Sequence, residues 1–259
     1  MQLGNVGAVF LFEWRRSLTA PRIAWWLILT CFPACIVGLI RLVPDEPPRE
    51  AWALVFFALF PMLVSMLGTF LWATPAISAE LERRSWVYLA VRPNGGTAVL
   101  LGKYLAAVSW VLTAAVVGLA IALAISPTDD WRRIGATIVS LVFLSCPAYA
   151  AVYLLLGTLF PKRSMAIAVA YTMVFELIIS LVPAMINKFT VQYRLRALVV
   201  DWADVSIGDQ REFVAMALIG DAPAWHHVLV LIVYTLFLLV VSVGVLRASE
   251  FSSEEESGV

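Results

Sequence analysis

The stretch "ISAELERRSWVYLAVRPNGGTAVLLGKYLAA" (77–107) lies between two strongly hydrophobic parts of a chain that is 62% hydrophobic overall. It begins with acidic and basic residues, passes through an Arg-Pro-Asn-Gly-Gly break at 92–96, and ends in a new apolar run. The residue before a proline disfavours the helical conformation, and Asn-Gly-Gly favours a turn. The stretch therefore predicts a short charged helix, ending at Arg92, that connects two apolar segments.

The composition of the whole chain is typical of integral membrane proteins. The mean hydropathy is +0.90, and only 14% of the residues are charged, compared with about 25% in soluble domains. The formal net charge is zero, so charge gives no reason to expect a nucleic-acid partner. A chain of 259 residues has room for six membrane spans but not for a separate soluble catalytic domain. We expect one all-α polytopic membrane domain over 1–259 in contact with the lipid bilayer.

The positions of the spans follow from the lengths of the apolar runs. A bilayer core about 30 Å thick needs roughly 20 helical residues, and connections rich in proline and charge, such as "VPDEPPRE" (43–50), separate the runs. The six predicted spans cover residues 23–43, 51–76, 98–125, 134–160, 165–187 and 226–247. Residues 188–225 form one long loop, and residues 248–259 form an acidic tail.

Lys and Arg in short flanks of the spans predict the orientation. Ten of them lie on one side: Arg15, Arg16, Arg22, Arg83, Arg84, Arg92, Lys103, Lys162, Arg163 and Arg247. Four lie on the other side: Arg41, Arg49, Arg132 and Arg133. We therefore expect both termini and the tail 248–259 in the cytoplasm, the loop 188–225 outside it, and the chain in the cytoplasmic (inner) membrane.

The N-terminal residues 1–22 are predicted to form an interfacial helix, since residues 5–20 are too charged to span. Val6, Phe10, Trp14 and Leu18 are four apart and form one apolar stripe on a helix. The charged residues Glu13, Arg15 and Arg16 fall outside that stripe. Such a helix fits the headgroup plane, with Trp14 at the interface; the alternative is an extension of the first span.

The charged helix 77–92 is predicted on the cytoplasmic side. It places Leu81, Trp86, Tyr88 and Leu89 on one broad side, while Glu80 and Arg84 can pair at i,i+4. A cytoplasmic helix with aromatic side chains suits the docking of a soluble partner. A solvated connector between two spans fits the composition equally well.

Three parts of the chain resemble the ABC-2 type transporter permeases. The run 77–83, with Leu89, Pro93 and "LLGK" (100–103), is similar to the signature that follows the second span in that family, although Arg84-Ser85-Trp86 stands where the family has Gly-Thr-Leu. "FEWRRSLTAPR" (12–22) resembles the family's interfacial helix. Glu176 followed by "KFTVQYRL" (188–195) resembles a branch with a glutamate in the fifth span.

The resemblance implies an ABC-2 type (type V exporter-like) fold with a cytoplasmic coupling helix after span two. It also implies a dimer with a second copy or a paralogous permease, docked to separate ATPase subunits that bind ATP and magnesium, and export of an unidentified substrate. This chain would then not be an enzyme. The implied ATPase-coupling residues are Glu80, Leu81, Glu82, Arg83, Arg84, Trp86, Tyr88 and Leu89.

No sequence pattern for catalysis, a cofactor or a metal is present. The nearest match to a P-loop, Gly96 to Lys103, has five residues between its glycines and a tyrosine after the lysine. Cys31 and Cys35 share a helix face, but we expect them to pack between helices as small apolar residues. His226 and His227 are adjacent, so they point roughly 100° apart on a helix and are poorly placed to hold one ion together.

Glu176 stands out because an ionised carboxylate at span depth costs about 2.5 kcal/mol or more. It could couple protons or cations, contact a substrate or act as a gate. Alternatively, it makes an interhelical hydrogen bond at the dimer seam, with Tyr153 or Tyr171 as partner.

The long loop 188–225 has two stretches with helical apolar spacing, which predict one or two short helices on the outer surface. They would seal the outer ends of the spans, or dock an extracytoplasmic partner.

Two other classes of function remain open at this point. The first is an ATPase-driven mechanical or scaffolding module that acts on an extracytoplasmic partner without moving cargo. The second is an ATPase-independent carrier or enzyme, which would be expected to show an internal repeat or a catalytic cluster, and the sequence shows neither.

Overall fold

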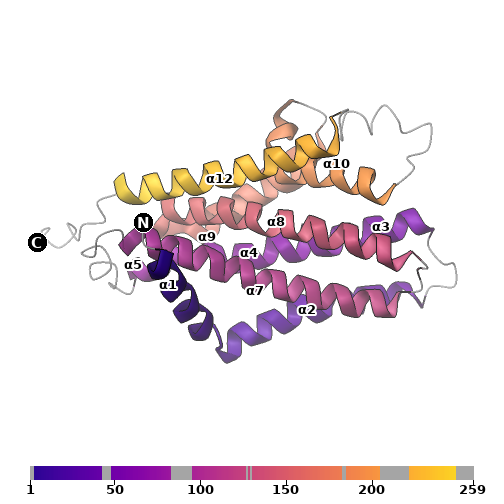
Figure 1. Cartoon of the computed structure of the whole chain (residues 1–259), viewed down its shortest axis with the longest axis horizontal. Helices are drawn as coiled ribbons and strands as arrows, with labels where there is room; N and C mark the ends of the chain where they lie inside the picture. Colours follow the sequence, from indigo (N-terminus) through magenta and orange to yellow (C-terminus); the bar gives the residue numbers. More distant parts are fainter. Residues whose placement is uncertain are drawn as a thin grey trace, which may run out of the picture.

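The computed structural model describes residues 3–42, 48–82, 95–126, 128, 130–182, 185–204 and 222–248, and every regular element in these ranges is helical. Five helices are long and apolar enough to cross a membrane: Ala20–Ile40, Glu50–Glu80, Gly95–Ile125, Trp131–Leu159 and Ala224–Ala248. They run side by side along the long axis of the molecule (Figure 1). The predicted all-α, multi-pass membrane architecture is thereby confirmed.

The elements follow one another in this order: α1 (Leu3–Arg16), α2 (Ala20–Ile40), α3 (Arg49–Phe57), η1 (Ala58–Val64), α4 (Ser65–Ala73), α5 (Pro75–Glu82), α7 (Gly95–Ile125), α8 (Trp131–Leu159), η2 (Pro161–Arg163), α9 (Ser164–Tyr171), η3 (Thr172–Ile178), η4 (Ile179–Leu181), η5 (Met185–Phe189), α10 (Val191–Ala203) and α12 (Ala224–Ala248). One end of the bundle, at the left of Figure 1, holds α1, α5, the start of α7 and the end of α12. The start of α3, the start of α8 and the end of α10 lie at the opposite end. We call these the α5 end and the α3 end.

Helix α8 forms the centre of the bundle. It packs against α4, α7, α10 and α12, and its large side chains Ile138, Leu141, Tyr149 and Tyr153 are fully buried. A helix that is apolar on all sides lies in a protein core or spans a membrane, and most of α8 is covered by the other helices of the bundle. Small polar groups also bind it to its neighbours, because the Ser145 hydroxyl donates to Ser65 Oγ at 2.9 Å.

The second long helix contains a widened turn, η1, around Pro61. Proline has no N–H to donate, so a regular α-helix cannot continue through it without a kink or a bulge. At the end of η1 the Ser65 N–H donates to the carbonyl of Phe60, five residues back, as in a π-bulge. The helical path nevertheless continues to Glu82, beyond the predicted end of the span at residue 76.

Helix α1 crosses the other helices at a steep angle (Figure 1) and packs against α7. Trp14 stacks on Trp110 with ring centroids 5.0 Å apart, and a Cβ at Gly102 would lie only 2.6 Å from Val9. The predicted stripe is partly wrong. Leu18 lies beyond the end of α1 and is 58% exposed, whereas Glu13, predicted outside the stripe, is buried.

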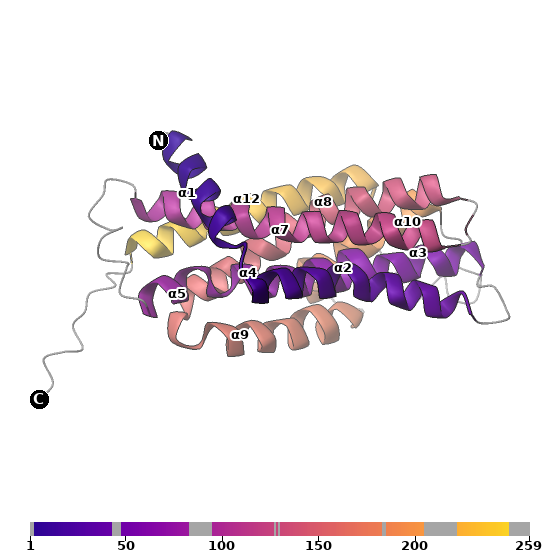
Figure 2. The same ribbon diagram turned by 90° about the horizontal axis from the view of Figure 1, so that it is seen from below.

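Residues 164–182, in the fifth predicted span, do not form one regular helix. α9 is followed by a π-helical segment, η3, and a 3-10 turn, η4, and this path runs along the outside of the bundle next to α8 (Figure 2). It is not among the five long apolar helices of the described residues. A second expectation also fails: Cys31 and Cys35 are exposed on α2 rather than packed between helices.

Close packing of backbones predicts a strong effect of one glycine substitution. A Cβ at Gly157 would lie 2.2 Å from the carbonyl oxygen of Thr74, and neither helix backbone can move away cheaply. We expect Gly157→Ala to destabilise the protein by about 1–3 kcal/mol. Scanning fluorimetry of the purified protein in detergent measures this loss. Gly244→Ala is the matched control, since nothing lies within 4 Å of its Cβ; an equal loss in both variants would contradict the packing argument.

Candidate functional sites

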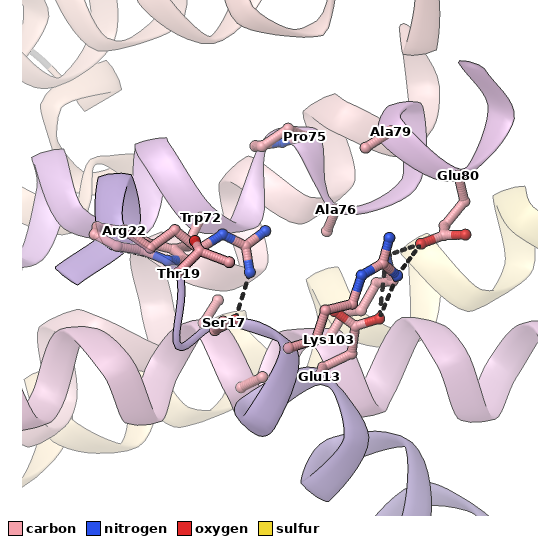
Figure 3. A pocket seen from close by; sticks show the side chains of 13 residues that line it. Glu13, Ser17, Thr19, Arg22, Trp72, Pro75, Ala76, Ala79, Glu80 and Lys103 are labelled. Atoms are coloured by element: carbon pink, nitrogen blue, oxygen red, sulfur yellow. Dashed lines mark hydrogen bonds and ion pairs between the residues drawn. The ribbon is translucent and has the colours of Figure 1, made fainter. Parts of the chain in front are cut away.

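A pocket of about 360 Å³ lies among α1, α2, α4, α5 and α7 (Figure 3). Glu80, the first of the predicted coupling residues, lines this pocket. The lining residues are Glu13, Arg16, Ser17, Thr19, Arg22, Trp72, Pro75, Ala76, Ala79, Glu80, Lys103, Ala106 and Ala107. Several elements far apart in the sequence thus meet around one polar space.

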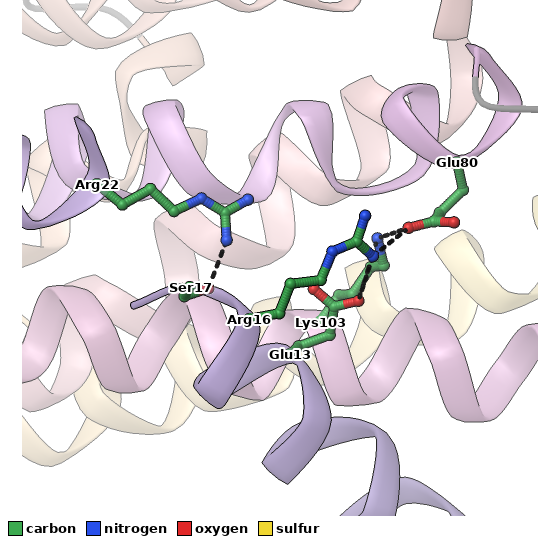
Figure 4. A network of polar contacts seen from close by, with 6 residues as sticks. All are labelled: Glu13, Arg16, Ser17, Arg22, Glu80 and Lys103. Atoms are coloured by element: carbon green, nitrogen blue, oxygen red, sulfur yellow. Dashed lines mark hydrogen bonds and ion pairs between the residues drawn. The ribbon is translucent and has the colours of Figure 1, made fainter. Parts of the chain in front are cut away.

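Four charged side chains at one end of this pocket form an ion-pair network (Figure 4). The Lys103 ammonium lies 2.7 Å from Glu80 Oε1 and 3.7 Å from Glu13 Oε1. The Arg16 guanidinium lies 3.5 Å from Glu80 Oε1 and 3.6 Å from Glu13 Oε1. Two cations and two carboxylates from α1, α5 and α7 therefore balance one another. We call these four residues the charged joint.

The burial of the charged joint requires this pairing. Glu13, Glu80 and Lys103 are each at most 9% exposed, and an unpaired charge at such a position carries a large desolvation penalty. Gly102 precedes Lys103 and lets α1 approach α7 closely, which brings Glu13 within reach. The joint fixes α5, the start of the segment 77–92, to α1 and α7.

The predicted coupling residues are described only in part. Glu80 is buried and belongs to the charged joint, with the Lys103 ammonium 2.7 Å from its carboxylate. Leu81 and Glu82 are the last residues of α5. The structure describes their backbone but not their side chains. The other five predicted coupling residues lie outside the described residues: Arg83, Arg84, Trp86, Tyr88 and Leu89. The tail residues 249–259 and the loop residues 205–221 lie outside them too.

Glu13, Arg16 and Lys103 are the members of the joint that are not among the residues predicted from the sequence to form a site. A signal was present, because a lysine inside an apolar helix of the length of α7 requires a partner. The distance along the sequence from Lys103 to Glu13 or Glu80 does not show which of these carboxylates Lys103 contacts.

Glu176, in η3, is the second candidate site, and its carboxylate is fully buried with four hydrogen-bond donors around it. The hydroxyl of Tyr171 donates at 3.0 Å to Oε1 and that of Tyr149 at 3.3 Å to Oε2. The first backbone N–H groups of α10 complete the set: Val191 N–H donates at 3.3 Å to Oε1 and Gln192 N–H at 3.2 Å to Oε2. The carboxylate is thus satisfied within one chain.

This arrangement makes Glu176 part of the N-terminal cap of α10. The first N–H groups of a helix have no partner inside it, and a carboxylate there is also favoured by the helix dipole. Thr190 Oγ1 accepts from Tyr193 N–H at 3.2 Å, so Thr190 and Glu176 together satisfy the first three N–H groups of α10. Tyr171 is confirmed as a partner of Glu176, whereas the Tyr153 hydroxyl bonds Thr172 at 2.7 Å.

Helix α10 does not lie on the outer surface as predicted for the loop 188–225. Tyr193, Leu195 and Leu198 are buried, and the helix packs against α8 and α12. It runs antiparallel to α8, from Tyr149 near its start to Thr137 near its end, where the Thr137 hydroxyl bonds the carbonyl of Trp202 at 3.5 Å. The apolar spacing of residues 191–203 correctly predicts a helix, but α8 and α12 cover its apolar side.

Neither site presents an arrangement for catalysis among the described residues. Glu176 is enclosed by its four donors, and the four described members of the charged joint pair with one another. His227 Nδ1 lies 3.2 Å from the Arg194 guanidinium, and the ring of His226 is nearly perpendicular to that of His227. Both sites join helical segments that are distant along the chain. The chain matches no protein-family model, and it has no match among curated proteins.

Proposed function

We propose that this chain is the membrane subunit of an ABC-2 type transporter, coupled to separate ATPase subunits and dimeric, in the cytoplasmic membrane with both termini in the cytoplasm. The proposal rests first on the resemblance of residues 77–103 to the family signature. The cargo would be exported, as in the family, and ATP and magnesium would be bound by the ATPase alone.

The charged joint is the observation that carries this proposal. A segment that receives force from a soluble ATPase must be held rigidly to the membrane helices, or its movement is lost. Glu80 leads directly into residues 83–92, and its ion pairs with Lys103 and Arg16 connect it to α7 and α1. A solvated connector has no need of a buried, charge-balanced attachment of this kind. The joint thus favours a docking segment over a passive link.

We propose that the chain crosses the membrane six times. Among the described residues, five single helices are long and apolar enough to cross it. The sixth is made by two pieces in tandem. The α9–η4 path starts at the α5 end, and α10 continues to the α3 end, where the Arg133 guanidinium lies 3.5 Å from the Asp204 carboxylate. Glu176 joins the two pieces by capping α10. An even number of crossings agrees with both termini lying on one side.

Co-purification with an ATPase subunit tests the proposed coupling. The full chain is expressed with the ATPase encoded nearest to it and isolated through a tag on the membrane subunit, in mild detergent with nucleotide present. We expect stoichiometric ATPase with the wild type, and its loss with Trp86→Ala and with Glu82→Ala, because an aromatic anchor and a charge would be removed from the docking surface.

Trp131→Ala is the matched control, since Trp131 is an exposed tryptophan at the start of α8, at the opposite end of the bundle. It should retain the ATPase fully. Absence of ATPase from the wild-type isolate would count against the permease proposal and favour an ATPase-independent protein. ATPase bound without any ATP-dependent movement of cargo would favour the scaffolding module.

A further inference from the structure

The pocket beside the charged joint holds one cation, Arg22, that forms no ion pair within the described part of the chain. Its charged lining residues are two carboxylates, Glu13 and Glu80, and three cations, Arg16, Lys103 and Arg22. The first four balance within the joint, whereas Arg22 has no ion pair among the described residues. Its guanidinium donates to the neutral Ser17 hydroxyl at 2.5 Å. The Arg22 side of the pocket therefore suits an anion.

Other hydrogen-bond donors face the same part of the pocket. Figure 3 shows Arg22, Thr19 and Trp72 together, on the opposite side of the pocket from Glu80. The indole Nε1 of Trp72 is buried with no hydrogen-bond partner in the described part of the chain, which is costly unless a ligand or water accepts from it. Thr19 precedes α2, and its hydroxyl makes no capping bond to that helix, so the positive end of the α2 dipole is also available.

The position of this site indicates a membrane lipid as the source of the anion. The pocket lies at the turn between α1, the predicted interfacial helix, and α2, a helix long enough to span the bilayer. Directly beyond Arg22, the apolar side chains of Ile23 and Leu27 are 39% and 49% exposed, and residues four apart share one helix face. A headgroup at Arg22 would place its acyl chains beside this face.

We propose that the Arg22 side of the pocket binds the phosphate of an anionic phospholipid, with the acyl chains along the exposed face of α2. The Arg22 guanidinium supplies the charge, and the Trp72 indole and the Thr19 hydroxyl supply hydrogen bonds. Guanidinium groups pair with phosphate through charge-assisted hydrogen bonds, and anionic headgroups attract basic residues at the membrane surface. The bound lipid would link the α1–α2 turn to α4 through Trp72.

Native mass spectrometry of the full chain, delipidated in detergent and titrated with dioleoyl phosphatidylglycerol, tests this site. We expect one tightly held lipid on the wild type. Arg22→Gln should weaken it by about tenfold, since loss of a charge-assisted contact costs about 1.4 kcal/mol or more. Trp72→Phe, which keeps an aromatic ring but removes the indole N–H, should weaken it by roughly threefold. Arg15→Gln is the matched control, because Arg15 is an exposed arginine like Arg22 but does not line the pocket.

The outcomes distinguish the alternatives. Unchanged binding in Arg22→Gln, or an equal loss in Arg15→Gln, would overturn the site, because the attraction would then be a general property of the basic surface. Glycerol 3-phosphate carries a phosphate without acyl chains; if it displaced the lipid at equal concentration, the ligand would be a soluble phosphate and the lipid assignment would be wrong. Equal melting temperatures of the lipid-free wild type and Arg22→Gln exclude misfolding as the cause of a loss.

Discussion

Replacement of Glu176 by alanine is expected to produce the largest loss of stability in this protein. It removes the acceptor of two buried backbone N–H groups, Val191 and Gln192. A buried donor without a partner costs about 1–3 kcal/mol, so the combined cost is about 2–6 kcal/mol before any cavity is counted. At about 2–4 °C per kcal/mol for a protein of this size class, the melting temperature should fall by about 10 °C. Scanning fluorimetry in detergent provides the measurement.

Two further variants separate the capping role of Glu176 from a role of its charge in transport. Glu176→Gln retains the side-chain volume but only one of the two acceptor oxygens, and its amide NH2 would face the other backbone N–H, so it should recover about half of the lost stability. Asp201→Ala removes a carboxylate from an exposed position on the same helix, α10, and should change the melting temperature little. A melting temperature within about 2 °C of wild type for Glu176→Ala, accompanied by loss of transport, would show that the carboxylate is functional rather than structural.

Replacement of Glu80 by alanine should produce the second large effect. Lys103 would remain 9% exposed without its partner at 2.7 Å, and loss of one member of a buried ion pair costs about 3–5 kcal/mol. Glu13, at 3.7 Å, would compensate part of this cost, so we expect about 3 kcal/mol. The same variant should release α5 from α7 and reduce the amount of ATPase that co-purifies.

A double-mutant cycle of Glu80→Ala with Lys103→Ala measures the interaction directly. Residues in contact show interaction energies of about 0.5–3 kcal/mol, and we expect this pair near the upper limit. The pair Arg133 and Asp204 is the control: its side chains are 47% and 75% exposed at 3.5 Å, and exposed ion pairs contribute about 0–1 kcal/mol. Equal interaction energies for the two pairs would contradict the assigned burial of the charged joint.

The long apolar helices could be predicted from the sequence because the bilayer imposes a length on each of them. α2, α7, α8 and α12 begin and end close to the predicted limits, where prolines and charged residues interrupt the apolar runs. The helix at the N-terminus was also predictable, since its charges forbid a span. Composition and spacing thus determined the all-α membrane architecture, and of the charged segment predicted at 77–92 the structure describes residues 77–82 as helical.

Only the tertiary structure decided how the polar residues are used. The sequence shows that Glu176 and Lys103 need partners, because a charge inside an apolar helix is costly. It does not show that Glu176 meets the start of α10, or that Lys103 meets Glu13 and Glu80, since these contacts join residues distant along the chain. For the same reason Glu13 and α10 were predicted on the surface and are buried. The spacing of apolar residues along the sequence shows which side of a helix is apolar. The neighbouring helices determine which side is buried.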